Sequence, residues 1–117
     1  MAIIEISHSC DGSVELVCRV RRAGVAEPDR VFTSGDGAKI PLRADTEIEV
    51  SFRPYPTPIG NEPHGLEAST QVTALLQRRF GREAIAVEGG AATVIADDQP
   101  AAVAFPREAK LIVKLAA

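Results

Sequence analysis

The chain has 117 residues, of which 45% are hydrophobic and 25% charged, and its formal net charge is −3. This composition is typical of a globular protein, it excludes wholesale disorder, and the length suits a single domain over 1–117. An acidic chain with four Phe, one Tyr and no Trp lacks the basic surface and stacking platforms of nucleic-acid binders, so no nucleic acid is expected as a partner.

The N-terminus alternates apolar and polar residues and carries an acid at Glu5, unlike the uninterrupted apolar core of a signal peptide. No stretch approaches the ~18 consecutive apolar residues of a membrane span. We therefore expect a soluble protein of the cytoplasm or of a virion, without secretion through a cleaved signal peptide and without a membrane partner.

Residues 3–9 and 14–22 predict a β-hairpin. Period-2 alternation gives each strand one apolar face, and a three-residue turn at 11–13 brings both faces to the same side. In that register Cys10 and Cys18 lie about 13 Å apart along the strands. This separation is too large for a disulfide, so two free thiols are predicted.

Residues 30–34 and 39–42 flank a glycine-rich turn and predict a second hairpin, and residues 46–53 predict a strand. The following segment, 54–65, contains four prolines. Proline donates no backbone hydrogen bond and biases the preceding residue toward extended geometry. The segment is therefore predicted to be an extended arm with polyproline character.

Residues 66–80 carry apolar side chains at helical spacing: Val72, Leu75, Leu76 and Phe80. Arg78 and Arg79 suit the last turn of a helix, and Gly81 suits the position after it. The pattern predicts one helix over about 66–80.

The last third of the chain predicts a hairpin of residues 82–88 and 91–97 and a final strand over 109–115. A two-residue Gly-Gly loop would place Ile85 opposite Val94. The Pro-bounded segment 99–106 is predicted to be a connection. The whole pattern predicts a mainly β (α+β) fold, an antiparallel β-sandwich or open barrel of about eight short strands with one covering helix.

His8 and Cys10 are the first candidates for chemistry because they share a strand face about 6.5 Å apart. With His64 they would form a metal site or a thiolate–imidazole pair. However, their face is predicted to pack inward, and nothing in the spacing shows that His64 converges with them. We predict no catalytic residue, metal or cofactor, and keep a small enzyme or metal-binding protein using these three residues as an alternative.

The two segments framed by prolines, 54–65 and 99–106, are expected to carry exposed apolar side chains. Proline lowers the conformational entropy lost on docking, which favours contact with another subunit, although it also suits segments that cover sheet edges. The residues predicted to bind a partner are Tyr55, Pro56, Pro58, Ile59, Val103 and Phe105.

The sequence therefore favours a non-enzymatic structural, assembly or protein-binding module. Its partner is expected to be a protein or copies of itself, in a homo-oligomer or a larger assembly. The most concrete form is a component of a virion or similar phage or bacterial particle. A small acidic inhibitor that binds a host protein is a second interpretation.

Overall fold

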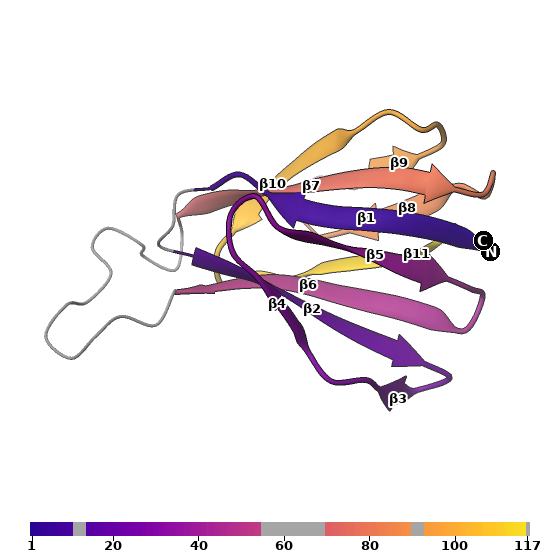
Figure 1. Cartoon of the computed structure of the whole chain (residues 1–117), viewed down its shortest axis with the longest axis horizontal. Coiled ribbons are helices and arrows are strands. Elements are labelled where there is room, and N and C mark those ends of the chain that lie inside the picture. The colour runs from indigo at the N-terminus through magenta and orange to yellow at the C-terminus, as the bar shows by residue number, and fades with distance from the viewer. Residues whose placement is uncertain (11–13, 55–69, 90–92, 117) are drawn as a thin grey trace, which may run out of the picture.

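A computed structural model of the chain describes residues 1–10, 14–54, 70–89 and 93–116. Within these ranges the regular elements are β-strands, arranged in two antiparallel sheets that pack face to face as a β-sandwich (Figure 1). The first sheet has four strands in the order β10-β7-β1-β5. The second has seven, in the order β3-β2-β6-β11-β8-β9 with β4 also paired to β2.

The strands of the first sheet are β1 (Ala2–His8), β5 (Gly37–Leu42), β7 (Gln71–Phe80) and β10 (Ala101–Pro106). The strands of the second sheet are β2 (Val14–Arg22), β3 (Val25–Ala26), β4 (Arg30–Phe32), β6 (Thr46–Pro54), β8 (Ile85–Glu88), β9 (Thr93–Ile95) and β11 (Leu111–Leu115). In the part of the chain described here, no helix could cross a membrane.

Alternate side chains from both sheets form the core. Along β1, β6 and β7, buried residues alternate with half-buried or exposed ones, as expected for strands with one face turned inward. Phe52 of the second sheet contacts two rings of the first, His8 at a centroid distance of 5.1 Å and Phe105 at 5.5 Å. These aromatic contacts join the two sheets near one end of the sandwich, where β1 and β6 end.

The predicted helix over 66–80 is wrong for the residues that the structure describes. Residues 71–80 form β7, which lies between β1 and β10 and pairs with both. Its inward face carries Val72, Ala74, Leu76 and Arg78. The spacing of the apolar residues is compatible with the period of a helix and with that of a strand. In the strand that forms, Leu75 points outward and Phe80 is 59% exposed. Residues 66–69 lie outside the described ranges.

The predicted hairpin of residues 3–9 and 14–22 is also wrong, although both strands exist. β1 pairs with β5 and β7, whereas β2 pairs with β6 in the other sheet. The predicted inward faces of the two strands are right. Strands in two facing sheets turn their apolar faces toward the same core, as the strands of a hairpin would. Cys10 and Cys18 are free thiols as predicted, but the register used to argue for this does not occur.

The second predicted hairpin fails in the same way, because β4 belongs to the second sheet and β5 to the first. The strand over 46–53 and the final strand are confirmed as β6 and β11. The later hairpin is confirmed as β8 and β9, with Ile85 opposite Ile95 instead of Val94. The segment 99–106, predicted as a connection, contains strand β10 at the edge of the first sheet.

The Pro-rich segment 54–65 lies between two described strands of different sheets. β6 ends at Pro54 in the second sheet, and β7 begins at Gln71 in the first. Residues 55–65 lie outside the described ranges, so the predicted arm stays a prediction.

Adjacent leucines in β7 provide a direct test of strand against helix. Leu76→Ala should lower the free energy of unfolding by about 2–5 kcal/mol because it empties a fully buried site. Leu75→Ala should cost less than about 1 kcal/mol, since this side chain lies on the half-exposed outer side. Urea unfolding of both variants measures the difference, and equal costs would contradict the strand.

Candidate binding surface

Only two of the six residues predicted to bind a partner are described, and both are in the core. Val103 is 4% exposed and Phe105 is fully buried, because odd-numbered residues of β10 point inward. Their side chains pack in the core between the two sheets and are not exposed on the outer surface of the chain. Tyr55, Pro56, Pro58 and Ile59 lie outside the described residues.

His8 is a core residue at the end of β1. Its ring is 1% exposed, stands edge-on to Phe52, and has Nε2 at 3.3 Å from the Phe32 carbonyl oxygen. With Nε2 as the donor, Nδ1 is a bare acceptor, and it has no hydrogen-bond partner in the described structure. The position therefore favours aromatic packing over ligand binding.

The cysteines show no activated thiol. Cys10 is half-buried, and its Sγ donates a weak hydrogen bond to the Thr73 carbonyl oxygen at 3.6 Å. Burial raises the pKa of the Cys18 thiol to about 12, against the smaller opposing effect of Arg30. Cys18 is thus protonated and unreactive near neutral pH. The described ranges contain no group of three or more side chains placed to hold a metal, and His64 lies outside them.

Arg78 is a buried cation, 6% exposed, on the inner face of β7. It donates through Nε to Asp98 at 3.0 Å, through Nη1 to the Glu83 carbonyl at 2.8 Å and through Nη2 to the Ala96 carbonyl at 3.2 Å. All three acceptors belong to the connections around β8, β9 and β10. These bonds give Arg78 a structural role at one end of the sandwich, because few of its donors remain for a ligand.

The outer face of the second sheet is crowded with ion pairs. At its centre, Glu49 of β6 is 13% exposed, accepts a hydrogen bond from Lys110 at 2.6 Å and lies 3.6 Å from Arg21. The Lys110 hydrogen bond holds the pKa of Glu49 below its ordinary value, and the charges of Lys110, Arg21 and Arg19 act in the same direction. Arg19 is itself paired with Asp29 at 2.9 Å. Most of the charges on this face therefore have a partner of opposite sign on the same chain.

The outer face of the first sheet is different. One row of small or apolar residues crosses its four strands, in the order Ala102, Leu75, Ser7 and Gly37. A second row has the order Phe80, Ile3 and Pro41 on β7, β1 and β5, and Phe80 is 59% exposed. We call this surface the neutral face and define it by Ile3, Ser7, Gly37, Pro41, Thr73, Leu75, Phe80, Ala102 and Ala104.

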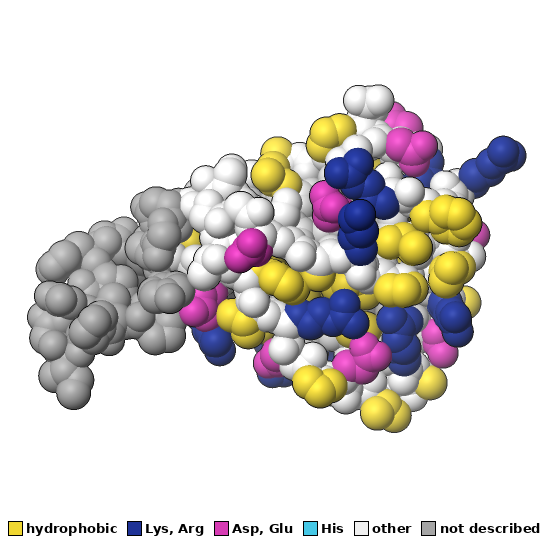
Figure 2. Space-filling view, viewed as in Figure 1, with side chains coloured by type: hydrophobic (Ala, Val, Ile, Leu, Met, Phe, Trp, Pro, Cys, Tyr) yellow, Lys and Arg dark blue, Asp and Glu magenta, His cyan; other side chains and the backbone are white. Residues whose placement is uncertain are grey.

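Charges on the neutral face are confined to a band between the two rows. Glu5 pairs with Arg79 at 3.2 Å, and Lys39 lies opposite Glu5 on β5. In the space-filling view, which shows one side of the molecule, patches of hydrophobic side chains lie among Lys, Arg, Asp and Glu groups (Figure 2). The two uncharged rows themselves have no charge to desolvate when a partner covers them.

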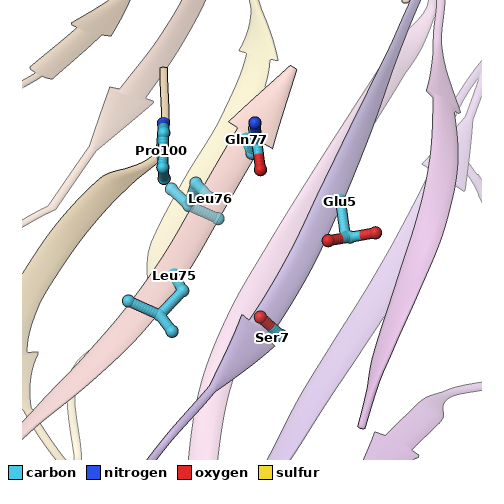
Figure 3. A pocket seen from close by; sticks show the side chains of 6 residues that line it. All are labelled: Glu5, Ser7, Leu75, Leu76, Gln77 and Pro100. Atoms are coloured by element: carbon cyan, nitrogen blue, oxygen red, sulfur yellow. The ribbon is translucent and has the colours of Figure 1, made fainter. Parts of the chain in front are cut away.

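A shallow pocket of about 140 Å³ opens between β1, β7 and the residue before β10 (Figure 3). It is lined by Glu5, Ser7, Leu75, Leu76, Gln77 and Pro100. Gln77 is held by a hydrogen bond to the Asp98 carbonyl oxygen at 2.9 Å. The volume is below the ~300–1,000 Å³ of typical small-molecule sites. The pocket is therefore better described as a recess of the neutral face than as an active site.

Comparisons with models of protein families, with curated proteins and with solved structures gave no match for this chain.

The neutral face was missed by reasoning from sequence because its members come from four strands. One signal was present in β10, where Val103 and Phe105 alternate with Ala102 and Ala104 in the period of a strand. The flanking prolines favoured a loop, but proline is tolerated at sheet edges. No comparable local signal places Ser7 beside Leu75.

The ion pairs around Glu49 predict a pH-dependent contribution to stability. Folding lowers the pKa of Glu49 from its ordinary value of 4.5, so the carboxylate stabilises the fold above that pH and loses this effect as pH falls through the lower folded pKa. Glu49→Gln should therefore cost about 1 kcal/mol at neutral pH and almost nothing in acid.

Glu88→Gln is the matched control, because Glu88 pairs with Lys114 at 3.3 Å but is 55% exposed. Its cost at neutral pH should be smaller than that of Glu49→Gln. Urea unfolding across the acid range measures both variants. A Glu49→Gln cost that does not change with pH would contradict this explanation.

Proposed function

We propose that this chain is a non-enzymatic protein-binding module that joins copies of itself or a larger assembly through the neutral face. The observation that carries the proposal is the contrast between the two outer faces. Most charges on the outer face of the second sheet are paired within the chain, whereas the neutral face leaves an exposed aromatic ring, Phe80, beside Ile3.

The physical argument concerns the cost of desolvation. When a partner covers paired charges, these groups lose water and gain no new partner, which costs free energy. Covering uncharged side chains releases water and desolvates few polar groups, so this cost is small. Exposed aromatic side chains commonly supply much of the binding energy at protein interfaces. Phe80, in one row with Ile3 and Pro41, is the exposed aromatic side chain of the neutral face.

The most concrete form of the proposal is a structural component of a virion or similar particle. The support for this form comes from the sequence: a short chain, many strands and the Pro-rich segment 54–65. Tyr55, Pro56, Pro58 and Ile59 stay in the proposal as a second contact region. Val103 and Phe105 are buried, so they would take part in a contact through the backbone of β10 and not through exposed side chains.

Two serines at equivalent places on the two outer faces test the proposal. Ser7 lies on the neutral face between Leu75 and Gly37, and Ser51 lies on the second sheet beside Val17. Ser7→Arg should lower the association constant of the chain at least tenfold, because it places an unmatched charge in the interface. Ser51→Arg, with the same change of size and charge, should leave it within about threefold.

Sedimentation equilibrium from about 10 μM to about 1 mM measures self-association over the range expected for a weak complex. Far-UV circular dichroism and urea unfolding confirm that both variants fold. Equal effects of the two substitutions, or an intact chain that stays monomeric at every concentration, would contradict assembly through the neutral face.

The Pro-rich segment is tested separately by the double substitution Tyr55→Ser and Ile59→Ser, which removes its two large apolar side chains and keeps all its prolines. If the segment contacts a neighbouring copy, the association constant should fall at least tenfold while the unfolding free energy changes by less than about 1 kcal/mol. Replacing Arg82 by Ser, at an exposed site in another connection, serves as the control. An unchanged association constant in the double variant would remove the segment from the proposal.

A further inference from the structure

In one edge strand of the first sheet, β10, the protection against pairing is confined to the prolines at its two ends, Pro100 and Pro106. Natural sheet edges are protected by charged residues, proline or short length. The opposite edge strand, β5, carries Lys39 and Pro41. In the second sheet, β3, β4 and β9 have two or three residues each. β10 has six residues and no charge, and within the described structure it pairs with β7 alone (Figure 1).

A hydrogen bond beyond the end of β10 shows which of its backbone groups point to the free edge. Arg107 N donates to the Thr70 carbonyl oxygen at 2.9 Å, one step past the pair of Pro106 and Gln71. Hydrogen-bonded pairs alternate along an antiparallel ladder. The odd-numbered residues of β10 therefore bond to β7, and Ala102 and Ala104 direct their N–H and C=O groups to the free edge.

We propose that two copies of this chain pair antiparallel through β10, around a two-fold axis at Val103. The inference rests on the proposed function and names a second copy as the partner. In this register Ala102 faces Ala104 of the second copy, and the two residues exchange both of their hydrogen bonds. The two four-stranded sheets become one continuous sheet.

The prolines that bracket β10 select this register. Pro100 and Pro106 each lie three residues from Val103, so they face each other across the axis, where neither has an N–H to donate. With the axis at Ala102, the Ala104 carbonyl would face Pro100 and receive no bond. With the axis at Ala104, the Ala102 carbonyl would face Pro106. Only the axis at Val103 satisfies every free donor and acceptor of Ala102 and Ala104.

The side chains fit the same register. Inward residues meet inward residues, so the buried ring of Phe105 lies beside the small Ala101 of the second copy and extends the core. On the outer side, Ala102 meets Ala104, and no charge opposes a like charge. A strand of six residues spans about 20 Å. A contact of this length is smaller than a standard interface of ~1,200–2,000 Å², so the dimer should form and dissociate with concentration.

Ala104→Pro tests the pairing, because it removes an N–H that points to the free edge and leaves the ladder with β7 intact. The association constant should fall at least tenfold. Ala104→Val is the matched control: it changes the same side chain, keeps the N–H and suits a strand, so association should stay within about threefold. Sedimentation equilibrium from about 10 μM to about 1 mM measures all three chains.

Amide hydrogen exchange of the unmodified chain, followed by NMR, gives a second measurement that needs no variant. The N–H groups of Ala102 and Ala104 should exchange more slowly as concentration rises, whereas Val103 and Phe105, already bonded to β7, should be protected at every concentration. Exchange at Ala102 and Ala104 that does not depend on concentration would overturn the proposal, as would unchanged association of Ala104→Pro.

The outcomes separate this pairing from the proposed function, because Ser7 lies on β1, two strands away from the edge. Association that Ser7→Arg weakens and Ala104→Pro does not would overturn the pairing and leave the proposed function. The reverse result would support the pairing and overturn the neutral face. A chain that is monomeric throughout would overturn both.

Discussion

The position of each long strand depends on one constraint, the burial of one face of each sheet in a single core. Alternate side chains of β1 and β2 are buried, although the two strands lie in different sheets. A local hairpin and a crossover between sheets both turn the apolar faces toward the same interior. The burial pattern therefore specifies the inward face of a strand without specifying its neighbour.

Arg78 shows how a charged residue satisfies the same constraint. It occupies an inward position of β7, where an unpaired guanidinium would be costly, and it is compensated by two backbone carbonyls and by Asp98. Asp98 is 73% exposed, so the ion pair extends from the core to solvent. The bonds of Arg78 join β7 to the connections that precede β8 and follow β9.

The two outer faces differ in their charges, and the proposed function assigns contact with other chains to the neutral face. Glu49 and its cationic neighbours stabilise the second sheet from outside. The neutral face and the free edge of β10 belong to the same sheet and meet at Ala102 and Ala104, which carry outward methyl groups and edge-directed backbone groups. A copy added at the edge would extend the neutral face across two chains and present a larger surface to a further partner.

The sequence alone determined which residues of β1, β2 and β6 face the core, because alternation is a property of consecutive residues. Only the tertiary structure decided strand pairing and the conformation of residues 71–80. Val72, Leu75, Leu76 and Phe80 fit the period of a helix as well as a strand, and the place between β1 and β10 selects the strand. The neutral face was also decided by the tertiary structure, since its residues become neighbours only when four distant segments pair.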